Sequence, residues 1–425
     1  MKFPRCSPTA ELQCHLLAPF SCGRRMARWH SIMRLIRGLV RSMSRITKFS
    51  ETKQCPVTLP ARSQPPRGRV LFSYLVQPLQ WSEDDARFGG HTNVWESREI
   101  ARILCSFGYE VDAINWNDKQ FVPEKKYDVC FDIATNLQRL APFLDERSIK
   151  ILHRTGSDPF YQNESEMARV RDLERRHQVH YSPKRLVAYP DLERKSMQIA
   201  DVCSLKGSSH TLRTYPREFR NKIKLVDVSG CKLPDNLKKE HDYVPSKREF
   251  LWFFGSGAVH KGLDLLLEAF SEHTELTLNV VGKLSSEQDF LRIYRHELME
   301  LPNIRFHGSL RTDSARFRKI IKDVFCFIAP SCSEGLSPAV VTCLQIGLYP
   351  LISRDTGVSL PSGCGTYLED CTVDEIENAI LEVFQMKTDD MSAEITRSQA
   401  YALSELSREK FREKMEDFIS MAVAR

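Results

Sequence analysis

The sequence predicts an α/β protein built from two successive series of strands and helices. Short apolar runs alternate with helix-length segments from Arg69 to Gly230, and a second alternation begins at Phe250. Strands separated by helices favour βαβ units with parallel sheets. Residues 231–247 are rich in Lys, Pro and Asp and indicate a connection between the two series. At 425 residues, the chain is long enough for two or three domains, each with its own core.

The first series begins with an apolar run and a loop that contains two glycines. Gly89 and Gly90 precede His91 and Asn93, and a helix is expected to follow at 94–107. Glycines there would let the backbone approach a ligand closely, although a tight turn explains them equally well. The other expected elements are strands at 69–76, 110–116, 127–133, 149–153, 201–205 and 222–228, and helices at 163–177, 192–200 and 208–215.

The second series contains a Gly-rich loop at residues 255–262, between a strand at 250–254 and a helix at 263–270. Gly257 and Lys261 lie in this loop, and Gly282 ends the next strand, at 276–281. Backbone N–H groups and a lysine at this spacing suit a phosphate. The loop has neither the Gly-Lys-Ser/Thr order of a Walker P-loop nor the glycine spacing of the dinucleotide fingerprint. By itself, this loop is weak evidence for a phosphate-binding site.

The stretch from Ala329 to Val358 is the one around which the chain is organised. A strand expected at 324–329 leads into a small polar loop, and another is expected at 349–353. Ser337 and Pro338 predict a helix start, with its end near Gly347. The first turn of that helix would suit a phosphate, and Glu334 could accept hydrogen bonds from sugar hydroxyls. The alternative is an ordinary crossover with a solvated Glu334.

Charge is spread unevenly along the chain. Residues 1–68 carry thirteen Lys/Arg and two acidic residues, a net charge of +11, whereas the remainder carries 48 basic and 53 acidic residues, a net charge of −5. A slightly acidic body argues against a nucleic-acid enzyme. Residues 26–48 predict a basic amphipathic helix, suited to an anionic membrane surface, within a partly disordered extension. A solvated tail, or a helix docked on the body, is the alternative.

Thirteen cysteines occur without a CxxC pair or a Cys/His metal-ligand spacing. They indicate reduced thiols in the cytosol rather than disulfides. We therefore expect a cytoplasmic protein, peripheral on the inner face of a membrane if residues 26–48 bind lipid. Residues 373–384 and 405–423 predict surface helices.

Several segments, in this order, resemble the donor domain of retaining family-4 glycosyltransferases of the GT-B fold. They are FFGSGAVHKGLDLLLEAF, LNVVGK, FHG and SEGLSPAVVTCLQIGLYPLIS. Segments of the first series, such as FGGHTNVWESREIARILCSFGYEVDAI, add to the resemblance, which covers nearly all of residues 69–425. It implies two Rossmann-like domains facing across a cleft, an acceptor-side domain at 69–235 and a donor domain at 236–400. A C-terminal helix at 401–425 would pack back on the first domain.

The resemblance also implies roles for particular residues. Lys261 would contact the donor diphosphate, Glu334 the transferred sugar, and His153 would face that sugar from the first domain, although a lone histidine is as often structural. The residues implied in donor binding are Gly257, Lys261, Gly282, Glu334, Gly335, Leu336, Ser337 and Thr342, and those near the acceptor or diphosphate are Gly89, Gly90, His91 and Asn93.

Two positions depart from the family pattern. Ser256 stands where the family has an arginine, and Thr342 stands where it has a second glutamate. The loss of one cation weakens charge compensation unless Arg305, Arg311 or another residue substitutes. A threonine hydroxyl cannot accept the pair of ribose hydrogen bonds that a carboxylate accepts.

The resemblance implies transfer of a sugar from a nucleotide-sugar to an acceptor hydroxyl with retention of configuration. By the resemblance, such a hexosyltransferase (EC 2.4 class) would require no metal, because the departing diphosphate itself helps to deprotonate the acceptor. No cofactor is expected, and the nucleotide-sugar is a co-substrate. Its role would be in polysaccharide or glycolipid assembly, with a carbohydrate, lipid or protein acceptor. The alternative is a catalytically impaired GT-B-like protein that binds nucleotide-sugar and acts as a regulatory or interaction subunit.

Overall fold

The computed structural model describes residues 56–227, 230–234, 237 and 248–424. The chain divides into two units, residues 1–54 and 55–425, and all described residues belong to the second. The amphipathic helix predicted at 26–48 therefore lies outside the described residues. Among those that are described, no helix is both long and apolar enough to cross a membrane.

The first sheet has seven strands in the order β1-β3-β2-β4-β5-β6-β7. All neighbouring strands are parallel except β1, which pairs antiparallel with β3. The strands are β1 (Val57–Leu59), β2 (Gly68–Tyr74), β3 (Tyr109–Asn115), β4 (Val129–Asp132), β5 (Ile149–Arg154), β6 (Val202–Lys206) and β7 (Ile223–Val226).

Strand β1 lies in a segment, residues 56–68, whose Pro, Ser and Arg content predicts a linker rather than a strand. Yet Val57 and Leu59 pair with Ala113 and Val111 on β3. The hydroxyl of Thr58 also donates a hydrogen bond to Asp112 (2.5 Å). The edge of β3 supplies the missing hydrogen-bond partners, so this short segment becomes part of the sheet.

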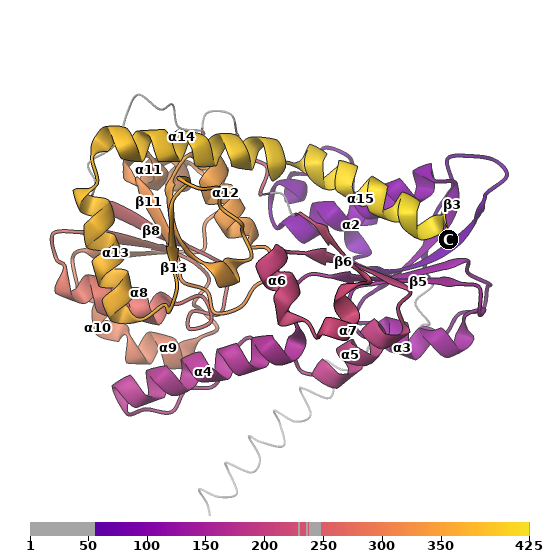
Figure 1. Cartoon of the computed structure of the whole chain (residues 1–425), viewed down its shortest axis with the longest axis horizontal. Helices are drawn as coiled ribbons and strands as arrows, with labels where there is room; N and C mark the ends of the chain where they lie inside the picture. Colours follow the sequence, from indigo (N-terminus) through magenta and orange to yellow (C-terminus); the bar gives the residue numbers. More distant parts are fainter. Residues whose placement is uncertain (1–55, 228–229, 235–236, 238–247, 425) are drawn as a thin grey trace, which may run out of the picture. The chain divides into compact units, whose positions relative to one another are not determined.

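Helices cover both faces of the first sheet (Figure 1). One face packs against α2 (Thr92–Ser106) and α15 (Arg408–Val423). The other packs against α3 (Asn136–Leu140), α5 (Pro190–Ile199) and α7 (Arg217–Arg220). The C-terminal helix thus shares the core of the first sheet, although it follows the second sheet in the chain. Two further helices of the first domain are α4 (Pro159–His177) and α6 (Ser209–Thr214).

The second sheet has six parallel strands in the order β10-β9-β8-β11-β12-β13. The strands are β8 (Glu249–Phe253), β9 (Thr277–Val281), β10 (Ile304–Gly308), β11 (Cys326–Ala329), β12 (Tyr349–Ser353) and β13 (Thr366–Leu368). Its helices are α8 (Leu263–Glu272), α9 (Gln288–Ile293), α10 (Arg295–Met299), α11 (Ala315–Asp323), α12 (Pro338–Ile346), α13 (Val373–Gln385) and α14 (Thr388–Glu405).

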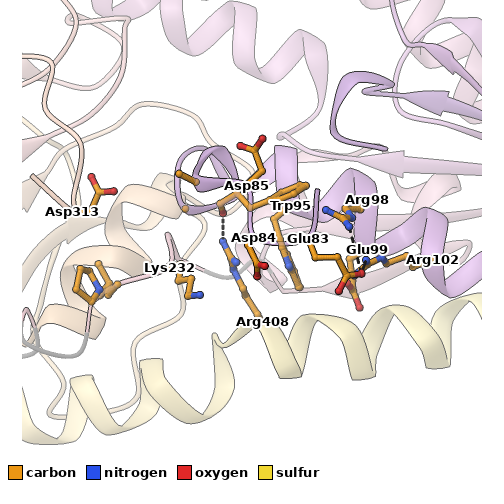
Figure 2. A pocket seen from close by; sticks show the side chains of 15 residues that line it. Glu83, Asp84, Asp85, Trp95, Arg98, Glu99, Arg102, Lys232, Asp313 and Arg408 are labelled. Carbon is orange, nitrogen blue, oxygen red and sulfur yellow. Dashed lines mark hydrogen bonds and ion pairs between the residues drawn. The ribbon is translucent and has the colours of Figure 1, made fainter. Parts of the chain in front are cut away.

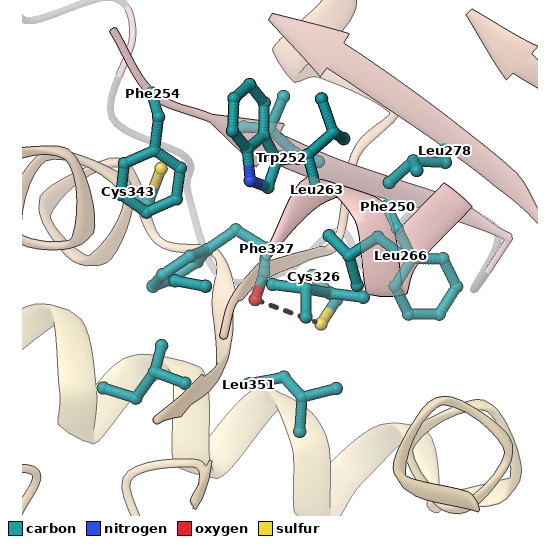
Figure 3. Close-up of a cluster of buried hydrophobic side chains, with 14 of the residues drawn as sticks. Phe250, Trp252, Phe254, Leu263, Leu266, Leu278, Cys326, Phe327, Cys343 and Leu351 are labelled. Atoms are coloured by element: carbon teal, nitrogen blue, oxygen red, sulfur yellow. Dashed lines mark hydrogen bonds between the residues drawn. The ribbon is translucent and has the colours of Figure 1, made fainter. Parts of the chain in front are cut away.

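The core of the second domain is built around β8 and the two strands beside it (Figure 3). Trp252 is fully buried there, and its indole N–H donates to the carbonyl of Lys261 (3.1 Å). This bond ties the Gly-rich loop to the strand that precedes it. The sequence did not predict α11, β13 or α14. Helix α14 packs on α12 and β12, and α15 follows it after Leu406 and Ser407.

Candidate active site

Two loops of the second domain meet at the carboxyl ends of the neighbouring strands β8 and β11. Residues 254–262 follow β8 and residues 330–337 follow β11. The backbone N–H of Cys332 donates to the carbonyl of His260 (3.0 Å), which joins the loops. Across this junction the side chains of Lys261 and Glu334 form an ion pair, and both are mostly buried. The structure thus brings together the two residues predicted to serve the donor.

The ion pair leaves Lys261 in an unusual electrostatic setting. Burial lowers the pKa of the Lys261 ammonium, and the positive charge of Arg185 lowers that pKa further. The carboxylate of Glu166 opposes both effects, because a nearby negative charge favours the protonated amine. A bound anion would have to share Lys261 with Glu334.

The Gly-rich loop is held by a carboxylate that sequence reasoning missed. Gly257 and Ala258 donate their backbone N–H groups to Glu287, at 2.7 and 2.9 Å. In this conformation the two amides are engaged by a protein carboxylate, and phosphate binding by this loop stays a prediction. Glu287 is itself buried. It lies in a polar stretch after β9, Ser285 to Asp289, whose composition is that of an exposed turn, so the sequence carries no signal for this role.

Two of the predicted glycines allow close packing. A Cβ on Gly335 would lie 2.4 Å from the carbonyl oxygen of Thr155 and 2.7 Å from that of Lys206. The hydroxyl of Thr211 donates to the Gly335 carbonyl (2.9 Å). A Cβ on Gly282 would lie 2.4 Å from the ring of Trp252. Gly335 therefore lets the ends of β5 and β6 in the first domain lie directly on the turn that carries Glu334.

Helix α12 begins at the residues that the sequence predicts, but its N-cap side chain does not make a capping hydrogen bond. Ser337 is the N-cap and Pro338 the first helical residue, yet the Ser337 side chain makes no capping hydrogen bond. Its backbone N–H donates to the carbonyl of Thr356 (2.9 Å), and Leu336 beside it is buried. The helix ends at Gly347, in the left-handed conformation (φ 91°).

Thr342 is fully buried in α12, and protein groups occupy its hydroxyl. The hydroxyl donates to the carbonyl of Pro338 (2.7 Å) and accepts from the backbone N–H of Cys231 (3.0 Å). In this structure Thr342 links α12 to the connection between the domains. Neither bond leaves its hydroxyl directed at a donor, and a donor contact by Thr342 stays a prediction.

His153 lies on β5 with its ring fully buried between Tyr74 and Phe131. Its Nδ1 is hydrogen-bonded to the hydroxyl of Ser204 (2.8 Å), and its Nε2 has no partner among the described residues. Burial, with the nearby charges of Lys206 and Arg154, holds the pKa of His153 well below its usual value. The imidazole is therefore neutral, with one nitrogen left for a ligand.

A polar cluster near His153 was also missed by sequence reasoning. Glu96, on the first turns of α2, pairs with Lys206 at the end of β6 (2.7 Å), and both side chains are buried. Within the described chain, buried polar atoms without a partner include Tyr74 Oη, Thr92 Oγ1 and Glu96 Oε1. Thr92 and Glu96 lie four residues apart on a helix that starts at the glycine loop, which is the one sequence signal for this cluster.

The first-domain loop lies at the start of α2. Gly89 ends a short 3-10 turn, Gly90 follows, and His91 is the N-cap of α2. Burial and the charge of Lys206 lower the pKa of His91, whereas a hydrogen bond with the Asn93 side chain raises it. Since Lys206 acts on both histidines, the loop and His153 belong to the same region of the first domain.

A pocket of about 440 Å³ lies beside the first-domain loop, with Phe88 and Gly89 in its lining, and Figure 2 shows its charged side chains. Arg408 of α15 reaches across it and donates to the carbonyl of Phe88 (2.5 Å). Lys261, Glu334 and His153 do not line this pocket. Its charged lining residues are of both signs: Glu83, Asp84, Asp85, Arg98, Glu99, Arg102, Lys232, Asp313 and Arg408. It is therefore separate from the predicted donor residues.

One group of side chains in the described part has the donor atoms of a metal site. Glu166 on α4, His260 and Cys332 place their ligand atoms within 4.8 Å of one another. His260 instead bridges Glu166 and the carbonyl of Ser333, each at 2.5 Å. Burial raises the pKa of the Cys332 thiol to about 12, with Lys261 among the cations nearby. These contacts form a hydrogen-bonded link between α4 and the two loops that follow β8 and β11.

The chain matches one protein family and several solved structures, but no curated protein. Residues 248–386 match the family described as Glycosyl transferases group 1. This segment contains residues 254–262 and 330–337, the two loops that carry Lys261 and Glu334.

Solved structures of low sequence identity share the arrangement of the two sheets. HepE from Anabaena, in complex with UDP and glucose, is 13% identical with a TM-score of 0.52, covering 83% of this chain and all of HepE. Sucrose-phosphate synthase from Thermosynechococcus elongatus is 12% identical with a TM-score of 0.56, covering 84% and 98%. WaaG, a glycosyltransferase involved in lipopolysaccharide biosynthesis, is 13% identical with a TM-score of 0.50, covering 83% and 99%.

At such identities the likeness establishes the fold alone. The expected two-domain α/β fold is confirmed by the two sheets, which are parallel apart from β1, and by these neighbours. The chain therefore has the GT-B fold, and its residues 248–386 match the Glycosyl transferases group 1 family.

Proposed function

We propose that this protein is a retaining glycosyltransferase that moves a sugar from a nucleotide-sugar to an acceptor hydroxyl, in polysaccharide or glycolipid assembly. The observation that carries the proposal is the Lys261–Glu334 ion pair, formed by the two loops of the Glycosyl transferases group 1 domain. The neighbour HepE has been solved with UDP-glucose, which supports a nucleotide-sugar as donor. Retention of configuration and independence of metal follow from the sequence resemblance.

In the proposed reaction the bond between the anomeric carbon and the donor diphosphate breaks. The acceptor oxygen bonds to the same face of the sugar, and its proton passes to the departing diphosphate. Lys261 and the N-terminus of α12 stabilise the negative charge on that leaving group. Glu334 accepts hydrogen bonds from the sugar hydroxyls, and the neutral His153 offers its free Nε2 from the first domain.

The second candidate is a GT-B protein that binds nucleotide-sugar and regulates a partner without turnover. Glu287 holds two amides of the Gly-rich loop, and Glu334 holds Lys261. The loop amides and Lys261 would have to lose these carboxylate partners before a diphosphate could bind fully to them. Ser256 adds no positive charge to the loop.

A donor screen separates the two candidates. UDP-, GDP-, ADP- and dTDP-sugars are tested for binding and for slow hydrolysis with the intact chain, Lys261→Ala and Glu334→Ala. We expect one donor to bind and to be hydrolysed, with turnover about 100-fold lower in both variants, because each removes a group that stabilises the transition state. Lys319→Ala, which removes an exposed lysine from α11, serves as the matched control.

Two results would contradict this proposal. Binding without hydrolysis by the intact chain would favour the regulatory subunit. Hydrolysis that is unchanged in Lys261→Ala would remove the catalytic assignment of the ion pair.

A further inference from the structure

We propose that Arg185, from the segment between α4 and α5 of the first domain, supplies the second positive charge that holds the donor diphosphate beside Lys261. The inference rests on the proposed function, and it deepens it by giving a first-domain residue a direct role in donor binding.

The donor loops by themselves offer little net positive charge. The charge of Lys261 is balanced by Glu334, and the Gly257 and Ala258 amides face the carboxylate of Glu287. A diphosphate ester carries about two negative charges, which charge-assisted hydrogen bonds to arginine or lysine compensate best. A further cation is therefore needed at this loop.

The arginines that the sequence suggested as substitutes are engaged elsewhere. Arg305 pairs with Glu249 (2.9 Å) and Arg311 pairs with Asp313 (2.6 Å). Lys206 is buried against Glu96. Each of these cations has a carboxylate partner of its own.

Arg185 lies directly on the Gly-rich loop. A Cβ built on Gly257 would lie 2.7 Å from Cγ and 2.9 Å from Cδ of Arg185. The stem of Arg185 therefore occupies the space that any other residue at 257 would need. Gly257 also has a positive φ of 91°, so glycine is favoured there on both counts.

The backbone of Arg185 is fixed at both polar groups. Its N–H donates to Oε1 of Glu166 (3.0 Å), and its carbonyl accepts from the side chain of Gln162 (2.6 Å). The second oxygen of Glu166 contacts His260 of the Gly-rich loop (2.5 Å). One carboxylate of α4 thus positions both Arg185 and the residue that precedes Lys261.

The guanidinium of Arg185 is exposed, and among the described residues it has neither a hydrogen bond nor an ion pair. Its charge still acts on the site, because it contributes to lowering the pKa of Lys261, His260 and His91. These three residues come from the donor loop and from the first-domain loop. An unpaired cation between them is placed to meet an anion that enters from solvent.

The test measures binding of UDP, GDP, ADP and dTDP to the intact chain and to three variants by calorimetry. Arg185→Ala removes the cation and Arg185→Lys keeps the charge without the guanidinium. Arg171→Ala removes an exposed arginine of α4 that has no partner among the described residues. We expect Arg185→Ala to weaken binding of the preferred diphosphate about 10- to 100-fold, the range of one charge-assisted hydrogen bond. Arg185→Lys should recover part of the loss, and Arg171→Ala should bind as the intact chain does.

The same nucleoside without phosphates provides a second readout. Its binding should not distinguish Arg185→Ala from the intact chain, since Arg185 is assigned to the diphosphate alone. If a diphosphate binds equally well to Arg185→Ala, the role of Arg185 is overturned while the proposed function stands. If the intact chain binds none of the four, both the proposed function and this inference fail.

Discussion

Lys261 and Glu334 come from different loops, yet each determines what the other can do. In the proposed reaction, Lys261 would bind the diphosphate and Glu334 would bind the sugar. As an ion pair they hold each other's charge, with little exposure to solvent. A bound donor must therefore compensate the charges of both groups at least as well as the two groups compensate each other. A nucleotide-sugar does so, because its diphosphate suits the lysine and its hydroxyls suit the carboxylate.

The buried His153 leads to a prediction of how the free energy of unfolding depends on pH. Its pKa in the folded protein lies well below the value of about 6.5 for a free histidine. As the pH falls through 6.5, the unfolded chain binds a proton that the folded protein refuses, so the free energy of unfolding decreases. One such histidine contributes up to about 1.4 kcal/mol per pH unit. In urea unfolding between pH 7 and pH 5, His153→Gln should show a shallower loss of stability than the intact chain.

Ser204→Ala is the matched control for that measurement. It removes the hydrogen-bond partner of Nδ1 but keeps the buried imidazole. It should lower the stability at every pH and retain the slope of the intact chain. An equal slope in His153→Gln would show that this histidine titrates normally.

At the scale of elements, helix α15 packs the C-terminal segment into the core of the first domain. Its apolar side chains Phe411, Met415 and Ile419 are fully buried in the core that α2 and the first sheet form. The helix lies beside α2, whose first turn carries the loop with His91. A segment that follows the second domain in sequence therefore supports the core of the first domain.

Phe411→Ala tests this packing. We expect a loss of about 3–5 kcal/mol in the free energy of unfolding, because a large aromatic side chain is removed from a fully buried site. Leu403→Ala on α14 is the control, since Leu403 is exposed and should change stability by less than about 0.5 kcal/mol. Denaturant unfolding of the two full-length variants makes the comparison. A small effect of Phe411→Ala would mean that α15 is not part of the folded core.

At the scale of the whole molecule, the first sheet begins before the predicted domain boundary at residue 69. Strand β1 covers the edge of β3, and Ala61 is buried. Removal of residues 1–55 keeps this edge paired, whereas removal of residues 1–68 exposes it. The shorter deletion is therefore the proper test of the basic extension.

We predict that the chain without residues 1–55 unfolds at the same temperature as the intact chain and binds the same donor. The chain without residues 1–68 should unfold at a lower temperature, because it loses the β1 pairing and the bond from Thr58 to Asp112. Flotation with vesicles of anionic lipid tests the role proposed for residues 26–48. The intact chain should float and the chain without residues 1–55 should not. Failure of the intact chain to float would end the membrane hypothesis.

The sequence by itself determined the fold class and the positions of the two strand-to-helix loops that follow β8 and β11. Apolar runs and their spacing depend on local burial, and glycine, serine and proline at helix ends depend on local backbone geometry. For these reasons β12 and α12 lie where the pattern placed them. The short β1 and β13 were missed, because three residues carry too little pattern and gain their stability from a neighbouring strand.

Only the tertiary structure decided how the site is held together. Glu287, Glu166 and Arg185 lie far from Lys261 in sequence, and nothing in their local composition points to a ligand loop. Their roles arise from charge and hydrogen bonding at close range, which depend on distances between segments rather than on residue order. The closed ion pair of Lys261 and Glu334, the Glu287 carboxylate on the loop amides and the unpaired guanidinium of Arg185 are properties of the folded molecule.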